Sequence, residues 1–214
     1  MSKLHSPSLS HPILSSRDST SAVYQIDPAS AEAAFALIVL SFAADPATRW
    51  SWPRPEDYLR NMPLLAHAFG GKSFTLGTAD AIDGLAGVAL WLPPGVTSDE
   101  EALGTLLERT APASIQQDAA GVFEQMASFH PHEPHWYLPL IGVDPARQGQ
   151  QLGDKLMAHA LARCDADRLP AYLESSNPRN LGFYQRHGFE ILGKIQVGSS
   201  PTIVPMLRKP RERR

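Results

Sequence analysis

The segment Ile141–Leu156 reads IGVDPARQGQQLGDKL and predicts a strand, a sharp turn and the start of a helix. The apolar run Leu138–Val143 is typical of a buried strand. Asp144 and Pro145 end it, because proline fixes φ and cannot donate a ladder hydrogen bond. A helix is expected from Gly149 to about Asp167, and its apolar residues recur at helical spacing, at Leu152, Leu156, Ala160 and Cys164.

The turn before this helix is suited to binding phosphate. A helix N-terminus without bulky side chains leaves its first N–H groups open, and these groups and the helix dipole attract an anion. The common nucleotide loops do not fit, because Gly149 and Gly153 are only four residues apart and no G-x-G-x-x-G pattern is present. For the loop alone, an ordinary connection with a polar first turn is the alternative interpretation.

A second motif follows at Asn177–Phe189, which reads NPRNLGFYQRHGF. Asn177 is a good N-cap, and the next residue is a proline at the first helical position. Gly188 can adopt the left-handed conformation after the helix, with Phe189 making the hydrophobic contact that accompanies such a cap. Asn177 and Tyr184 are seven residues apart, about two helical turns, so both are expected on one face of the helix.

Together the two segments resemble the GNAT superfamily of N-acetyltransferases. The first resembles the family's acetyl-CoA loop, V-x-P-x-x-Q/R-G-x-G-x-G/A, and the matching residues are Val143, Pro145, Gln148, Gly149 and Gly153. Gln151 stands where the family usually has glycine, and a side chain there could narrow the approach of the pyrophosphate. The second resembles the signature N-x(6)-Y-x(3)-G-F, and its fixed positions are Asn177, Tyr184, Gly188 and Phe189. The resemblance covers roughly residues 22–209.

This resemblance implies an α+β (mixed α/β) fold with a splayed, mostly antiparallel sheet flanked by helices. It also implies acetyl-CoA as co-substrate, with the pyrophosphate bound by the backbone N–H groups of residues 148–154 and the pantetheine beside residues 141–143. The residues expected to bind the cofactor are Ile141, Gly142, Val143, Gln148, Gly149, Gln150, Gln151, Leu152, Gly153, Asp154, Asn177 and Tyr184. The alternatives are a plain buried strand for residues 141–143 and a simple N-cap for Asn177.

Two residues are the candidates for catalysis. Tyr184 is expected to be the general acid, because a phenol can protonate or stabilise the departing CoA sulfur; a core tyrosine is the alternative. Many family members carry a glutamate six residues before the position of Val143, where this chain has Tyr137. Glu174, at the end of the next strand, is therefore the candidate for the general base, with His135 or a chain of water molecules as alternatives.

Composition restricts the remaining classes of function. The chain has 214 residues, 43% of them hydrophobic, and predicts a single domain over residues 21–209 between a disordered segment 1–20 and a basic tail 210–214. A net charge of −3 gives no basis for nonspecific binding to nucleic acid or to a membrane. No apolar run is long enough to span a bilayer and the start lacks the shape of a signal peptide, so a cytoplasmic protein is expected.

Several other residues could suggest different chemistry. His130, His132, Glu133 and His135 resemble a zinc-ligand cluster, but two prolines stiffen this stretch as a loop and no metal is expected. The single cysteine, Cys164, lies on an apolar helix stripe and is expected in the core. An acceptor pocket could be lined by the aromatic residues Trp50, Trp52 and Trp91, although core packing is the better interpretation of each.

Outside the two motifs, the pattern of apolar residues and breakers predicts the remaining elements. The expected helices are 30–44, 55–69, one beginning at Ser98 with Glu101 in a capping box, and 112–129. The expected strands are 22–26, 72–78, 85–92, 135–143, 171–174, 189–197 and 202–207.

The resemblance thus implies an acyltransferase that moves the acetyl group of acetyl-CoA to a primary amine of a small molecule or peptide in a ternary complex. The alternative is a sensor or structural module on the same fold that binds acyl-CoA without turnover. Gln151 and the missing strand glutamate favour the sensor, whereas Tyr184 opposes it. The amine acceptor is unidentified, and a homodimer is among the assemblies that the sequence allows.

Overall fold

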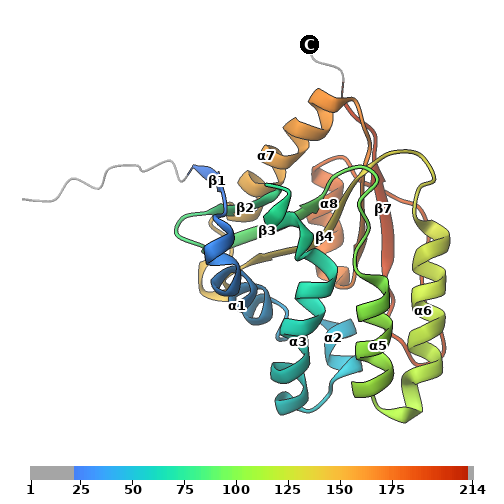
Figure 1. The fold of residues 1–214 in the computed structure, drawn as a ribbon. Helices are drawn as coiled ribbons and strands as arrows, with labels where there is room; N and C mark the ends of the chain where they lie inside the picture. The colour runs from blue at the N-terminus through green and yellow to red at the C-terminus, as the bar shows by residue number, and fades with distance from the viewer. Residues whose placement is uncertain (1–21, 212–214) are drawn as a thin grey trace, which may run out of the picture.

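The computed structural model describes residues 22–211, which form a seven-stranded sheet between two layers of helices (Figure 1). The strands are β1 (Val23–Gln25), β2 (Ala79–Ile82), β3 (Gly87–Leu92), β4 (Trp136–Val143), β5 (Ala171–Ser175), β6 (Glu190–Ile191) and β7 (Val204–Arg208). The α-helices are α1 (Ala31–Ser41), α2 (Pro46–Ser51), α3 (Pro55–Gly70), α4 (Lys72–Thr75), α5 (Glu100–Thr110), α6 (Gln116–Phe129), α7 (Leu152–Asp167) and α8 (Leu181–Arg186).

The strand order is β1-β2-β3-β4-β5-β7-β6, and all pairs are antiparallel except β4 with β5. This mixed, mostly antiparallel sheet confirms the predicted fold class. In Figure 1, α7 lies above the strands, while α1, α2 and α3 lie below them. Two apolar clusters fill the two sides, one around Phe35 and Met62 from α1 and α3, the other around Leu156 and Met157 from α7.

β4 and β5 separate soon after they meet. Their parallel pairing is limited to Trp136 with Ala171 and Tyr137 with Tyr172. A bulge in β4 lies just beyond, because Tyr137 pairs with Leu92 and Leu140 with Leu90, which leaves one extra residue on β4. Pro139 lies within this bulge, where a missing backbone donor does the least harm. The far half of β4 therefore has one edge that β5 does not pair.

The bulge also reverses which side chains face which helix layer. Before it, Trp136 and Leu138 pack with the α7 cluster; after it, Leu140 packs with the α1 and α3 cluster, and Ile141 and Val143 face α7. In a regular strand, residues 138 and 140 would share one face. The extra residue thus directs the second half of β4 toward both the helix that starts at Leu152 and the gap beside it.

Several expected boundaries were wrong. Residues 72–78 do not form a strand: Lys72–Thr75 are helix α4, and β2 begins only at Ala79. The helix expected from Ser98 begins at Glu100 and is capped by Asp99, whose carboxylate accepts from the Ala102 N–H, so the capping box was wrong as well. The strand expected over 189–197 is limited to Glu190–Ile191, followed by an isolated bridge from Ile195 to Ile203.

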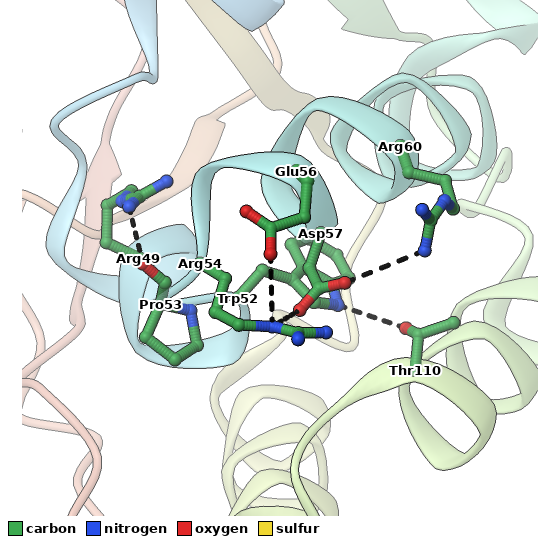
Figure 2. Close-up of polar contacts among 8 residues, drawn as sticks. All are labelled: Arg49, Trp52, Pro53, Arg54, Glu56, Asp57, Arg60 and Thr110. Carbon is green, nitrogen blue, oxygen red and sulfur yellow. Dashed lines mark hydrogen bonds and ion pairs between the residues drawn. The ribbon is translucent and has the colours of Figure 1, made fainter.

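The junction of α2 and α3 is held by polar contacts around the buried Trp52 (Figure 2). The Trp52 indole N–H donates to the Thr110 hydroxyl at 3.0 Å and ties this junction to the end of α5. Arg54 contacts Asp57 at 2.6 Å, and Arg49 donates to the Pro53 carbonyl at 2.6 Å. The Trp52–Thr110 hydrogen bond joins the α2–α3 junction to α5, and all three helices contribute to the wall of a pocket described below.

The expectation of disorder for residues 1–20 concerns residues outside the described range. Among residues 22–211, no helix is both long enough and apolar enough to cross a bilayer.

Candidate active site

A cavity of about 380 Å³ occupies the gap between β4 and β5. It is lined by eleven of the twelve residues expected to bind acetyl-CoA, namely Ile141, Gly142, Val143, Gln148, Gly149, Gln151, Leu152, Gly153, Asp154, Asn177 and Tyr184. Gln150 is the exception, because its side chain turns to accept a hydrogen bond from Arg147 Nε at 2.8 Å. Glu174 also lines this cavity. The two motifs and the candidate base therefore meet in one space.

The turn at the end of β4 presents open backbone donors to this cavity. α7 begins at Leu152, and Lys155 donates to the Gln151 carbonyl at 3.1 Å, which is the first hydrogen bond of the helix. The N–H groups of Leu152, Gly153 and Asp154 lie ahead of that bond, at the positive end of the helix dipole. All three residues line the cavity. The helix start thus has the donors that a pyrophosphate needs.

Gln151 adopts a backbone conformation that the sequence did not predict. Its φ is 60° and its ψ is 16°, so it lies in the left-handed region just before α7, and the expectation that the helix starts at Gly149 was wrong. A left-handed residue with a Cβ costs about 1–2 kcal/mol, and glycine avoids most of this cost. The glycine usual at this position in the related acetyl-CoA loops therefore has a conformational reason, and this chain keeps the conformation without the glycine.

We expect Gln151→Gly to raise the free energy of unfolding by about 1 kcal/mol, because it relieves the left-handed strain. The same change should tighten acetyl-CoA binding, because it removes a side chain from the cavity wall. Urea unfolding and calorimetric titration measure the two effects. Gln150→Gly is the matched control: Gln150 does not have a positive φ, so glycine there should lower stability. Equal decreases in the free energy of unfolding of the two variants would contradict the explanation by left-handed strain at Gln151.

Gly142 lets α1 approach β4. A Cβ on Gly142 would overlap Ser41 Oγ and lie 2.9 Å from Ser41 Cβ, so the hydroxyl would have to rotate and the end of α1 would have to shift. The Ser41 hydroxyl donates to the Ile38 carbonyl at 3.0 Å, and Ser41 itself lines the cavity. The glycine therefore has a packing role that brings the end of α1 to the wall of the cofactor cavity.

Tyr184 lies on α8, which is positioned by the second motif. The Asn177 carboxamide accepts from the Arg179 N–H at 3.1 Å, Pro178 starts the following turn, and Gly188 has a φ of 90°. These are the cap positions that the sequence predicted. The Tyr184 ring is buried and packs edge-to-face against Phe183. Burial, and then the negative charge of Asp45, raise the pKa of the Tyr184 phenol, so it stays protonated at neutral pH.

Glu174 lies near the end of β5 within a cluster of aromatic and histidine side chains. Its side chain is only 4% exposed, and its Oε1 accepts no hydrogen bond from residues 22–211, although His130 Nε2 lies 3.4 Å away. Burial, and then the charge of Glu174, raise the pKa of both Tyr137 and Tyr172. Tyr137, at the position where many relatives have glutamate, thus lies beside a carboxylate supplied by the next strand.

His135, the alternative base, lines neither of the two cavities that Glu174 lines. Its Nδ1 contacts the Glu133 carbonyl at 2.8 Å, and burial lowers its pKa. The His130 ring packs against His135, with 5.4 Å between ring centroids, and is partly exposed. His130 therefore connects Glu174 with the surface, a position that no sequence motif marks.

Asp45 is a second buried carboxylate at the site, which the sequence did not reveal. It caps α2, accepting from the N–H groups of Ala47 and Thr48, and it accepts from the Ser176 hydroxyl at 2.6 Å. Burial raises the pKa of Asp45, and these hydrogen bonds oppose the rise. A cap before Pro46 is a readable signal, but its contact with Ser176 joins residues 131 positions apart.

Other residues that line the cavity also lacked a signal, among them Asn180, Arg186 and Phe183. Arg147 lines it too and is held by Asp83. Arg147 and Arg186 bring positive charge to a cavity that also holds Asp154, whose carboxylate contacts His187 Nε2 at 3.0 Å. The walls thus have both backbone donors and cations for a phosphate group.

The other candidate chemistries find little support in the geometry. Among residues 22–211, no three His, Cys, Asp or Glu side chains are grouped so as to hold a metal ion. Cys164 is buried, and burial raises the pKa of its thiol to about 12, so it is not a thiolate at neutral pH. Trp50 lines a second cavity, whereas Trp52 and Trp91 are fully buried in the core.

Comparison with known proteins agrees with this geometry. Residues 45–189 match the family described as "Acetyltransferase (GNAT) family". An uncharacterized N-acetyltransferase of Schizosaccharomyces pombe is 29% identical over 165 residues, which cover 69% of this chain and 63% of that protein, so the chain spans less than two thirds of this relative.

Solved structures show the same fold. One titled as histone acetyltransferase HPA2 and related acetyltransferase, from Corynebacterium glutamicum, has a TM-score of 0.65 and 25% identity, covering 90% of this chain and 98% of that one. Arylalkylamine N-acetyltransferase 2 from Aedes aegypti has a TM-score of 0.63 at 13% identity, covering 90% and 100%. A Drosophila melanogaster polyamine N-acetyltransferase has a TM-score of 0.53 at 14% identity, covering 88% and 99%. With more than half of its length matched by the family, this chain belongs to the GNAT acetyltransferases.

Proposed function

We propose that the protein transfers the acetyl group of acetyl-CoA to a primary amine while both substrates are bound. The observation that carries this proposal is the convergence of three features on one cavity: the open start of α7, the unpaired edge of β4, and the side chains of Tyr184 and Glu174. The residues present fit acetyl-CoA, because the start of α7 offers N–H donors to its pyrophosphate and the edge of β4 offers backbone groups to its pantetheine. When bound, the group supplies an acetyl group activated as a thioester.

The two candidate side chains have complementary roles in this proposal. Glu174 takes a proton from the ammonium of the acceptor, so that the nitrogen lone pair can attack the acetyl carbon. A carbon–nitrogen bond forms, the carbon–sulfur bond breaks, and the nitrogen then releases its second proton, which balances the proton that Tyr184 gives to sulfur. Tyr184, protonated at neutral pH, donates to the departing sulfur. Positioning both substrates in one cavity supplies much of the remaining rate enhancement.

His130 is the route by which we propose the proton leaves Glu174. Its Nε2 is 3.4 Å from Glu174 Oε1, and its side chain is 31% exposed, whereas that of Glu174 is 4% exposed. A buried carboxylate that accepts a proton in each turnover must release it, and an adjacent imidazole has one ring nitrogen that can accept the proton and another that can pass one on. The pair thus joins the cavity to solvent.

We expect Glu174→Gln to lower the transfer rate about a hundredfold, because glutamine cannot accept the proton. Release of free thiol from acetyl-CoA, together with the mass of the acetylated amine, measures the rate. His130→Gln should give a smaller loss in the wild-type background and little further loss in the Glu174→Gln background, because the two residues serve one proton path.

Glu190→Gln is the matched control, because Glu190 is an exposed carboxylate on β6 outside both cavities. A wild-type rate in Glu174→Gln would contradict the assignment of the base. Absence of thiol release from the wild-type protein with every amine, despite bound acetyl-CoA, would contradict the proposed function and favour a non-catalytic acyl-CoA-binding protein.

A further inference from the structure

A second cavity, of about 110 Å³, adjoins the cofactor cavity. The two cavities share five lining residues, Phe42, Asp45, Pro139, Glu174 and Ser176. The second cavity extends from this shared mouth between the sheet and the helices α2, α3, α5 and α6. A molecule bound there would meet the first cavity beside the two carboxylates.

The charges of the second cavity are confined to its mouth. Asp45 and Glu174 are the only acidic residues among those lining it in the described part of the chain, and no basic residue lines it. Both carboxylates are buried. The Asp45 oxygens accept from Ala47, Thr48 and Ser176, and Glu174 Oε1 accepts no hydrogen bond from residues 22–211, although His130 Nε2 lies 3.4 Å away. Two carboxylates at the mouth of a cavity without basic residues favour an ammonium group there.

The body of the second cavity is apolar. Its walls include Leu65, Phe69, Leu107, Val122, Phe123 and Met126. An apolar wall favours an apolar group of the ligand and excludes a second ammonium, because burying an unpaired charge costs far more free energy than burying an unpaired neutral group. In size, the cavity is comparable to an apolar cavity of about 150 Å³ that binds benzene in another protein.

From this separation of charge and apolar surface we infer that the acceptor is a primary monoamine carrying one compact apolar group, such as a single aromatic ring or a short branched alkyl chain. The ammonium lies at Asp45 and Glu174, and the apolar group fills the space among α3, α5 and α6. This inference rests on the proposed function and narrows it, because diamines and polyamines would place a second ammonium against apolar walls.

The test compares acetyl transfer to 2-phenylethylamine, to 1,4-diaminobutane and to a lysine peptide by thiol release and product mass. We expect kcat/KM to favour 2-phenylethylamine by about a hundredfold or more, the scale of discrimination that unpaired buried groups produce. A preference for the diamine, or for a lysine peptide, would overturn the inference while leaving amine acetylation in place. No transfer to any of the three, with acetyl-CoA bound, would overturn the proposed function and the inference together.

A substitution in the cavity wall tests whether this cavity determines the preference between the two amines. Met126→Glu places a carboxylate on the apolar wall, so kcat/KM for 2-phenylethylamine should fall at least about tenfold and the ratio between the two amines should move toward the diamine. Ala127→Glu is the matched control: it adds the same charge at the next residue of α6, which is exposed and outside the cavity, and should leave the ratio unchanged.

Calorimetric titration with acetyl-CoA checks that Met126→Glu is folded, because a folded variant should bind acetyl-CoA as tightly as the wild type. If that variant does not fold, Met126→Trp provides the second test, because it fills the cavity without adding charge. It should raise KM for 2-phenylethylamine more than KM for a short alkylamine such as ethylamine. An unchanged ratio in whichever variant folds would overturn the inference.

Discussion

Replacing Tyr184 with phenylalanine is expected to lower the rate of acetyl transfer by about 10²–10⁴-fold, the range typical of a positioned acid, while leaving the affinity for acetyl-CoA nearly unchanged. The ring remains in place, because it packs against Phe183 and Phe189 with centroid distances of 5.2 and 6.0 Å, and phenylalanine preserves both contacts. Only the hydroxyl is lost, and with it the donor for the departing sulfur.

The expected loss is measured in single-turnover experiments, because slow product release can hide a change in the chemical step. Calorimetric titration with acetyl-CoA gives the affinity. Tyr24→Phe is the matched control: Tyr24 lies on β1, is 42% exposed and lines neither cavity. An unchanged single-turnover rate in Tyr184→Phe would remove Tyr184 from the mechanism. Loss of acetyl-CoA binding would show that the hydroxyl binds the cofactor instead.

The pKa of Tyr184 predicts the pH range in which the rate of acetyl transfer should not fall through loss of the phenol proton. Burial, and then the charge of Asp45, raise this pKa above its usual value of about 10. The phenol therefore stays protonated through neutral and mildly alkaline pH, and Tyr184 should not cause a fall in rate between pH 7 and about pH 10.

The second large effect concerns stability rather than rate. Asp165→Asn is expected to lower the free energy of unfolding by about 3 kcal/mol at pH 7, because it leaves the Arg208 guanidinium buried without its partner. Arg208 is 3% exposed, and its Nη1 and Nη2 donate to the two Asp165 oxygens at 2.7 and 2.8 Å. Its Nε also donates to the His187 carbonyl at 3.1 Å, so the pair joins β7, α7 and the end of α8.

The stability difference should depend on pH in a defined direction. The hydrogen bond from Arg208 holds the pKa of Asp165 below its usual value, with burial opposing the effect. A group with a lowered folded pKa stabilises the protein fully above its unfolded pKa of about 3.9 and loses that effect as pH falls through the folded value. The difference between wild type and Asp165→Asn should be constant from pH 5 to 8 and shrink below about pH 4.

Urea unfolding at pH 7 and pH 3 measures this difference. The double variant Asp165→Leu with Arg208→Met removes both charges, and it should recover most of the lost stability, because no unpaired charge remains buried. A double variant as unstable as Asp165→Asn would contradict the unpaired-charge explanation. A difference that grows as pH falls would contradict the direction of the pKa shift.

Local signals predicted the parts of the fold that local chemistry controls. Asn177, Pro178 and Gly188 specify the start and end of one short helical segment, and the structure has the cap bond and the positive φ that these residues favour. In each case the residue type restricts the backbone at its own position, so neighbours along the chain are sufficient.

The wrong expectations arose where distant contacts override local preference. β2 contains Asp80, which is 1% exposed and does not look like a strand residue. The buried Asp80 carboxylate is stabilised in β2 because Arg163, on α7 and 83 residues away, donates to its Oδ2 at 2.9 Å. This contact is not visible in the order of residues.

Most of the second cavity could not be predicted for the same reason, although Trp50 and Glu174 were named as candidates from the sequence. Its walls come from α2, α3, α5 and α6, and its mouth from Asp45 and Glu174, which are brought together only by the fold. None of these positions belongs to a motif, and helical spacing shows that a residue faces inward without showing which cavity it faces. The lining of the cavity between β4 and β5 was easier to anticipate, because its turn, strand edge and helix start are consecutive in the chain.

Calorimetric titration of the full-length protein with acetyl-CoA tests the central claim most directly, with ATP as the comparison ligand. We expect saturable binding of one acetyl-CoA per chain and much weaker binding of ATP, because the cavity offers an unpaired strand edge to pantetheine as well as donors to phosphate. Absence of acetyl-CoA binding at millimolar concentration would contradict the assignment of the cavity between β4 and β5 and the acetyltransferase function built on it.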